Sequence, residues 1–209
     1  AGVDILDLKN PSQGALGAWD THDLIRAVAF IGDRTPVSAT IGDLPMEPET
    51  LSAAVAATAA TGVDFVKVGF FAENNGDGDA QLCAQAIGNC ERGAARLVAV
   101  LFADQSPDFS LLGVLAANGF SGVMLDTADK TGGGLRHHLE SGVLARFVGE
   151  AAAHGMFSGL AGSLALGDAR PLLELGPDYL GFRGALCGAQ DRRGALDPHA
   201  LAQLAAVFQ

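Results

Sequence analysis

The sequence is poor in cationic side chains, since Lys and Arg number 13 against 24 Asp and Glu, and the formal net charge is −11. Nucleic acids and anionic lipids are bound largely through clustered Lys and Arg, so this balance argues against a broad contact with either. No apolar run reaches the ~20 residues that cross a bilayer. A signal-peptide pattern is also lacking at the first residues. We therefore expect a cytoplasmic protein without nucleic-acid or membrane partners.

Metal-binding and cofactor motifs are also lacking. Cys83 and Cys90 are two helical turns apart, which is poor spacing for a metal clip, and reduced thiols are expected. His137 and His138, which we place in or near a polar loop, have no metal-ligand spacing to a cysteine or carboxylate pair. No G-x-G-x-x-G loop follows the first apolar segment, so dinucleotide binding is not indicated. We predict neither a metal nor an organic cofactor.

Seven short segments rich in Val, Ile, Leu and Phe are flanked by Gly or Pro, a pattern typical of buried parallel strands. Stretches with apolar spacing of three and four residues lie between them and predict helices. This alternation favours βα units around a parallel sheet. Without a Pro-rich or Ser-rich linker, we expect one domain over residues 1–209. The predicted strands are residues 3–9, 37–43, 64–70, 97–103, 122–127, 157–161 and 179–183.

A weak internal repeat supports the same organisation, because a glycine precedes several of the predicted strands. Glycine in this position suits the C-terminal cap of the preceding helix. Gly2 has the same place before the first strand, and we expect a further strand and helix upstream of it. These would raise the strand number to the eight of a TIM (β/α)8 barrel, whose first strand and helix are then missing from this chain. The glycines of the repeat are Gly2, Gly62, Gly119, Gly155 and Gly176.

Lysine is the scarcest cation, and its distribution is unusual. The three lysines, Lys9, Lys67 and Lys130, each fall at or just beyond the C-terminal end of a predicted strand. Lysines normally lie on solvated helix faces, whereas the ends of barrel strands and the loops after them build active sites. We expect the three amines to share one site. A neutral lysine amine attacks carbonyl groups, and desolvation or a neighbouring cation lowers the pKa of such an amine.

Two aspartates accompany these lysines. Asp7 and Lys9 are two residues apart on one strand, so their side chains project from the same face. Asp126 lies at the end of another strand, four residues before Lys130, and forms a second acid-base pair. Each pair could instead be a structural ion pair that ties a loop to the barrel. The presence of Lys67 in addition favours the catalytic interpretation.

Phosphate-binding residues are predicted after the last two strands. Gly162 and Ser163 follow one of them, and Arg183 and Gly184 end the other. Small residues let backbone N–H groups approach an anion, and barrels often bind phosphate in these loops. Arg183 could add a bidentate contact. The alternative is a tight turn without a ligand.

Other strand ends give weaker candidates. Thr40 and Asp43 could touch a substrate, but Asp43 is equally well explained as a helix cap or turn residue. The same alternative applies to Asp104.

Taken together, the motifs resemble those of the (5-formylfuran-3-yl)methyl phosphate synthases, TIM-barrel enzymes of methanofuran biosynthesis. The resemblance extends from the first residues to Asp197, and the combination is more specific than any single motif. The matching segments are 4–11 (DILDLKNP), 14–18 (GALGA), 38–43 (SATIGD), 66–69 (VKVG), 124–127 (MLDT), 160–163 (LAGS) and 183–185 (RGA).

The resemblance implies a lyase that condenses two glyceraldehyde 3-phosphate molecules into a phosphorylated furan aldehyde, with loss of water and one phosphate. It also implies that Lys9 forms a Schiff base and that Asp7, Lys67, Asp126 and Lys130 are its acid-base and charge partners. The partner is then a small triose phosphate, and a homo-oligomer is left open.

The sequence departs from the family pattern after Cys187, where the family often has a lysine and Gly188 stands here. One phosphate contact is then either lost or supplied by Arg192 or Arg193. Two other activities are alternatives: a class I aldolase acting on another phosphorylated aldehyde, and a noncatalytic barrel that binds a phosphometabolite.

Overall fold

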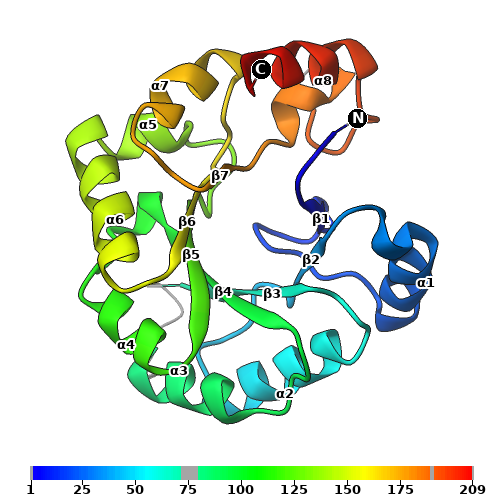
Figure 1. Cartoon of the computed structure of the whole chain (residues 1–209), viewed down its shortest axis with the longest axis vertical. Coiled ribbons are helices and arrows are strands. Elements are labelled where there is room, and N and C mark those ends of the chain that lie inside the picture. Colours follow the sequence, from blue (N-terminus) through cyan, green and yellow to red (C-terminus); the bar gives the residue numbers. More distant parts are fainter. Residues whose placement is uncertain (1, 72–79, 189–190, 209) are drawn as a thin grey trace.

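The computed structural model describes residues 2–71, 80–188 and 191–208. Seven parallel strands form one curved sheet in the order β1-β2-β3-β4-β5-β6-β7, so each strand pairs with its neighbour in sequence (Figure 1). This simple order follows from the repeated βα unit, in which each helix crosses back to start the next parallel strand. The strands are β1 Leu6–Leu8, β2 Val37–Thr40, β3 Phe65–Phe70, β4 Arg96–Phe102, β5 Phe120–Asp126, β6 Phe157–Leu160 and β7 Tyr179–Leu180.

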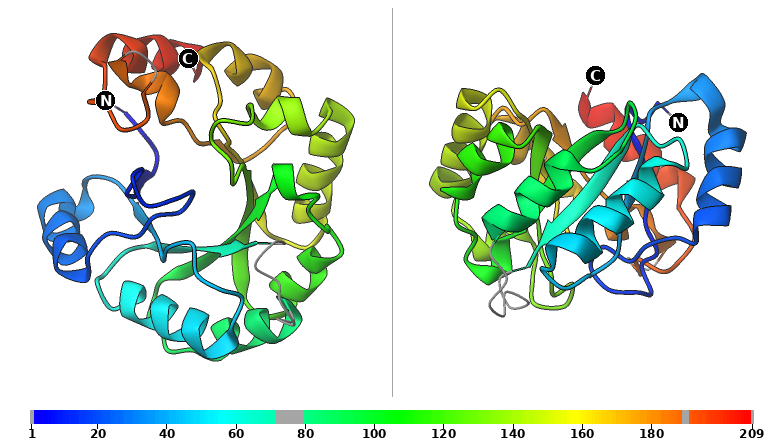
Figure 2. Two further views of the ribbon diagram at one scale, coloured as in Figure 1. Left: turned by 180° about the vertical axis from the view of Figure 1, so that it is seen from behind. Right: turned by 90° about the horizontal axis from the view of Figure 1, so that it is seen from below.

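Helices cover the outer, convex side of the sheet (Figure 2). All seven predicted strands are present, and helices occupy the stretches between them in which they were predicted. The short helix α5 was not predicted: His137 and His138 lie in it and not in a polar loop. The helices are α1 Thr21–Ile31, α2 Pro48–Ala59, α3 Ala80–Asn89, α4 Leu111–Ala117, α5 Leu135–His138, α6 Ser141–Ala153, α7 Ala169–Leu173 and α8 Pro198–Ala205.

The glycine repeat marks helix ends as predicted. Gly62, Gly119, Gly155 and Gly176 all have positive φ, between +72° and +87°. Each donates its backbone N–H to a carbonyl in the last turn of the preceding helix, at 3.0–3.1 Å. Only glycine enters this left-handed conformation at little cost, so the repeat fixes where each helix stops and the next strand begins.

Two parts of the hydrophobic core lie on opposite sides of the sheet, and a third, small cluster lies at helices α7 and α8. The larger part lies between the sheet and the helices and contains Leu97, Leu125 and Leu160. The smaller part lies inside the curve and contains Phe102, which stacks on Phe71 with ring centroids 4.1 Å apart. Because side chains alternate along a strand, strands β3 to β7 contribute to both parts, whereas β1 and β2 contribute only to the outer one. The inner part supports the polar side chains at the C-terminal ends of the strands.

The edges of the sheet are β1 and β7, which do not pair with each other in the described residues. Closure by an eighth strand stays a prediction. None of the helices in the described ranges combines the length and hydropathy needed to cross a membrane.

Candidate active site

Asp126 is the centre of a buried ionic cluster at the C-terminal ends of the strands. It ends β5, and its two oxygens face different amines: Oδ1 lies 2.5 Å from Nζ of Lys130, and Oδ2 lies 3.5 Å from Nζ of Lys9. The backbone N–H of Thr127 also donates to Oδ1 at 2.8 Å. Lys130 further donates to the carbonyl oxygen of Thr127. The predicted pairing of Asp126 with Lys130 is therefore present, and Lys9 shares the same carboxylate.

Asp7 forms the second part of the cluster, with a partner that sequence spacing did not suggest. Its Oδ1 accepts a hydrogen bond from Oγ of Ser38 at 2.5 Å and lies 3.1 Å from Nζ of Lys67. Lys9 is close enough to act on Asp7 electrostatically, but its ion pair is with Asp126. Ser38 was not singled out from the sequence, although it lies on β2 two residues before Thr40 and so shares its face.

The position of Lys67 differs from the prediction. Lys9 directly follows β1 and Lys130 lies four residues beyond β5, as expected. Lys67, however, is the third residue of the six-residue strand β3 and lies deeper inside the curve of the sheet. The strand itself was predicted to within one residue, at 64–70. The error was to place Lys67 at the end of this strand, whereas it lies near the middle.

Electrostatics keep both aspartates ionised. Burial alone would raise the pKa of Asp126, but Lys9, Lys130 and the hydrogen bonds hold it at about 2. Burial would likewise raise the pKa of Asp7, but the charges of Lys67 and Lys9 and the hydrogen bond from Ser38 outweigh burial and lower this pKa. Burial is also the main cause that lowers the pKa of Lys130, aided by the positive charge of Lys9 and opposed by Asp126. The carboxylates therefore stay charged and hold the amines in place.

The three amines differ in how firmly they are held. The side chain of Lys9 is 17% exposed, that of Lys130 13% and that of Lys67 8%. Lys9 also has the longest ion-pair distance, at 3.5 Å. Of the three, Lys9 is thus the most accessible and the least constrained.

The predicted phosphate-binding segment after β6 lies beside this cluster. Gly162 has φ +101°, and a Cβ built on it would stand 2.9 Å from Cγ2 and 3.0 Å from the backbone nitrogen of Thr127. Ser163 also has positive φ, 46°, and its Oγ is 3.5 Å from the carbonyl oxygen of Lys130. The chain after β6 is therefore pressed against the loop that carries Lys130.

The second predicted segment, after β7, has a different arrangement. Arg183 donates from Nε to the carbonyl of Arg192 at 3.0 Å and from its terminal nitrogen to Gly194 at 3.4 Å. Gly184 begins the 3₁₀ turn Gly184–Leu186 that follows. Arg192 in turn donates to the carbonyl of Gly14 at 3.2 Å. Arg192 thus links the loop after β7 to the loop after β1, across the mouth of the curved sheet.

The weaker candidates organise loops. Thr40 donates to the carbonyl of Gly17 at 3.0 Å. The carboxylate of Asp43 accepts the backbone N–H groups of Ala15 and Leu16 at 2.7 and 2.6 Å. Asp43 therefore ties the loop after β2 to the loop after β1, and a contact with substrate stays a prediction. Both residues fix the loop that follows Lys9.

Asp104 has a similar function on the other side of the site. Its carboxylate accepts the backbone N–H groups of Ala128 and Asp129 at 2.8 and 2.7 Å, which fixes the loop leading to Lys130. A cavity of about 300 Å³ lies here, bordered by Asp104, Asp129 and His138. Its two carboxylates make it unfavourable for a phosphate. In the described ranges, no group of three or more His, Cys, Asp or Glu could hold a metal ion.

The cluster as a whole is suited to proton transfer and to amine chemistry on a carbonyl group. An accessible amine, Lys9, stands beside two firmly held ammonium groups and two carboxylates. A neighbouring cation favours the neutral form of an amine, which is the nucleophile. The held ammonium groups can donate protons to a bound oxygen.

The sequence was compared with known proteins. The model of the 4-HFC-P synthase family matches residues 1–205. A protein of Methylorubrum extorquens is 44% identical over 97% of this chain and 82% of its own length. Its provisional name is (5-formylfuran-3-yl)methyl phosphate synthase. The (5-formylfuran-3-yl)methyl phosphate synthase of Methanopyrus kandleri is 36% identical over 98% of this chain and 90% of its length. The (5-formylfuran-3-yl)methyl phosphate synthase of Methanothermobacter thermautotrophicus is 35% identical over 91% of this chain and 84% of its own length.

Solved structures share the fold at low sequence identity. Phosphoribosyl anthranilate isomerase from Thermus thermophilus aligns with a TM-score of 0.60 at 14% identity, over 99% of this chain and 90% of its own. The tetrameric deoxyribose phosphate aldolase from Aeropyrum pernix aligns with a TM-score of 0.58 at 12% identity, over the same shares. These likenesses concern the fold alone, which is a parallel α/β sheet curved like that of barrel aldolases.

Proposed function

The chain belongs to the 4-HFC-P synthase family, and from that premise we propose that it condenses two molecules of glyceraldehyde 3-phosphate to (5-formylfuran-3-yl)methyl phosphate. The reaction joins two trioses through a carbon–carbon bond, closes a ring and releases water and one phosphate. The observation that carries the proposal is the ionic cluster around Asp126 and Asp7, which brings three lysines to one end of the sheet.

Lys9 is the proposed Schiff-base nucleophile. Its support is geometric, because Lys9 is the most exposed of the three amines and has the longest ion-pair distance. The neutral amine attacks the aldehyde carbon, and the aldehyde oxygen then leaves as water. The resulting iminium withdraws electrons from the adjacent carbon, so this carbon loses a proton and attacks the second triose.

Lys67 and Lys130 are the proposed acid-base groups. Each is held by one carboxylate, Lys67 by Asp7 and Lys130 by Asp126, so each is directed inward while protonated. Ring closure and the loss of water need protons delivered to leaving oxygens and removed from carbon. Two amines at different depths can serve the two trioses, and general acid-base catalysis of this kind contributes roughly 10²–10⁴-fold.

The phosphate groups are proposed to bind at the loops after β6 and β7. Gly162 and Ser163 lie beside the loop that carries Lys130, and Gly184 begins the turn after β7. None of the three has a bulky side chain that would keep an anion from its backbone N–H group. Arg183 and Arg192 add positive charge at the mouth, where an otherwise acidic protein needs it. Since Gly188 brings no charge of its own, Arg192 is the residue proposed to supply the second phosphate contact.

The proposal is tested by incubating the purified protein with glyceraldehyde 3-phosphate alone. The expected result is a rising near-ultraviolet absorbance from the conjugated furan aldehyde, together with released phosphate. A class I aldolase would consume the triose without this absorbance or phosphate. A noncatalytic binding protein would leave the triose unchanged, and either outcome would reject the synthase.

A further inference from the structure

The hydroxyl group of Tyr179, the only tyrosine in the chain, has no function in the site described above. Tyr179 lies on the edge strand β7, and its ring packs on the inner core. Space for the ring comes from Gly159 on β6, where a Cβ would stand 2.2 Å from Cζ of Tyr179. The hydroxyl is buried and has no hydrogen-bond partner in the described part of the chain. Leaving a buried hydroxyl unsatisfied is unfavourable, so it calls for an explanation.

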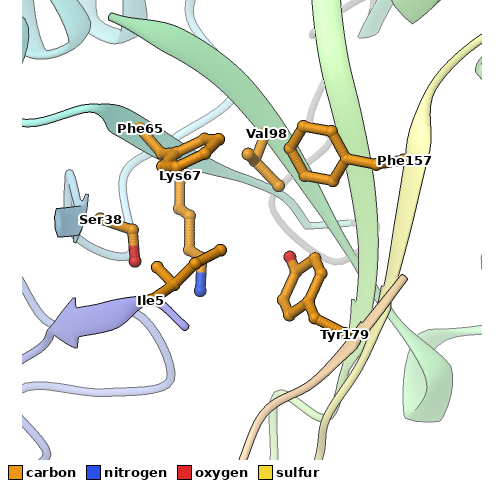
Figure 3. A pocket seen from close by; sticks show the side chains of 7 residues that line it. All are labelled: Ile5, Ser38, Phe65, Lys67, Val98, Phe157 and Tyr179. Carbon is orange, nitrogen blue, oxygen red and sulfur yellow. The ribbon is translucent and has the colours of Figure 1, made fainter. Parts of the chain in front are cut away.

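A small cavity adjoins this residue. Its volume is about 10 Å³, which is close to the minimum that holds one water molecule. Three of its lining residues are polar and come from different strands: Ser38 from β2, Lys67 from β3 and Tyr179 from β7 (Figure 3). A buried water needs two to four polar partners, and these three side chains supply them. The other lining residues are apolar: Ile5, Phe65, Val98 and Phe157.

We propose that one water molecule fills this cavity and bridges the hydroxyl of Tyr179 to the ammonium group of Lys67, which makes Tyr179 a positioning residue for Lys67. An ammonium group has three N–H donors, and Asp7 accepts from one of them. The water accepts a second and exchanges a hydrogen bond with Tyr179. The Tyr179 ring also lies 5.9 Å from Nζ of Lys67, within range of a cation–π attraction.

The contribution of Tyr179 is that of a neutral partner. Burial raises the pKa of Tyr179 far above its ordinary value, and nearby carboxylates add to this effect, so the phenol stays protonated. It can therefore orient the water and solvate the ammonium form of Lys67, but it is not a base. Charged groups near Lys67 and Tyr179 are Asp7, Lys9, Asp126 and Asp178, and the guanidinium of Arg96 lies over the cavity-lining rings of Phe65 and Phe157.

The structural half of the proposal is tested without any assay of activity. A crystal structure that resolves ordered waters should contain one within about 3.2 Å of both Oη of Tyr179 and Nζ of Lys67. In the Tyr179→Phe variant, which keeps the ring, this water should be displaced or absent. An empty cavity in the parent protein, or a hydroxyl paired elsewhere, would overturn the bridge whatever reaction the protein catalyses.

The positioning role is tested by NMR on protein with ¹³C at the lysine ε-carbons, which gives signals from only three residues. Tyr179→Phe should move the titration of the Lys67 signal to lower pH, because the charged amine loses a solvating partner. The signals of Lys9 and Lys130 should move less. Met124→Leu, a core substitution that does not border the cavity, is the control for general repacking. An unchanged Lys67 titration in Tyr179→Phe would refute the role.

The kinetic expectation rests on the proposed function. Tyr179→Phe should lower kcat about 10-fold, as expected for one lost hydrogen bond, while KM for glyceraldehyde 3-phosphate stays within a factor of about two. If the parent protein makes no furan, the proposed function fails, but the crystal structure and the lysine titration still decide on the water bridge. Equal kcat values in the parent protein and in Tyr179→Phe would contradict the positioning role of Tyr179.

Discussion

The Nζ of Lys67 lies 3.1 Å from Oδ1 of Asp7, across the strand β2 that separates β3 from β1. Both residues therefore point into the curve of the sheet, and their contact spans two strand intervals. A salt bridge of this kind is buried on the Lys67 side and half-buried on the Asp7 side, with side-chain exposures of 8% and 33%. Breaking it leaves a buried ammonium without its counterion, which costs more than the loss of a surface pair.

A double-mutant cycle on this pair should show strong coupling. Lys67→Ala and Asp7→Asn are each expected to lower kcat by about 10²–10⁴-fold, because both weaken the same proton-transfer group. The double variant should be little worse than Lys67→Ala alone, since residues that act as a unit are not additive. Circular dichroism checks that each variant is folded. Multiplicative losses would instead show that the two residues act independently.

Stability should depend on Asp126 in acid. Its pKa is 3.8 ordinarily and about 2 in the folded protein, so the folded state binds fewer protons than the unfolded chain in this window. The stabilisation is complete above about pH 4, falls as the pH drops toward 2, and amounts to about 2 kcal/mol. Denaturant unfolding at pH 5 and at pH 2 measures it. Between pH 5 and pH 2 the free energy of unfolding of Asp126→Asn should fall by about 2 kcal/mol less than that of the parent protein. An equal fall in both proteins would contradict the lowered pKa of Asp126.

Gly162 should be intolerant of a side chain. Gly162→Ala places a methyl group against Thr127 in a backbone conformation with φ +101°, at an expected cost of about 1–3 kcal/mol in the free energy of unfolding. Binding of inorganic phosphate should weaken as well. Gly167→Ala is the matched control, because a Cβ there meets no atom within 4 Å. Equal free energies of unfolding in the two variants would show that the loop after β6 accommodates a side chain at position 162, which would contradict the prediction.

The fold was predictable because its signals are local. Runs of β-branched and apolar residues located all seven strands, and glycines such as Gly119 marked helix ends through a backbone conformation that other residues avoid. Helix α5 escaped prediction because its four residues are too few for an apolar period. Its N-terminal end is held instead by a hydrogen bond from the N–H of Leu135 to the carbonyl of Gly162.

The clustering of these lysines and aspartates was predictable, but their pairing was predictable only in part. Residue spacing placed Asp126 with Lys130, which the contacts confirm. It also placed Asp7 with Lys9, whereas the contacts join Asp7 to Lys67 and Lys9 to Asp126. Contacts between strands depend on sheet curvature and on side-chain depth, and neither can be read from the spacing within one segment. Tyr179 and Ser38 were missed for the same reason, since no pattern near them in the sequence points to Lys67.

Reductive trapping with borohydride in the presence of glyceraldehyde 3-phosphate tests the central claim most directly, because it captures the Schiff base as a stable secondary amine. With only three lysines in the chain, peptide mass spectrometry identifies the modified residue. The expected result is one adduct, on Lys9, that is absent from Lys9→Ala and from Lys9→Arg, whose guanidinium stays protonated. An adduct on Lys67 or Lys130 in the parent protein, or furan formation by Lys9→Ala at the parent rate, would contradict the account.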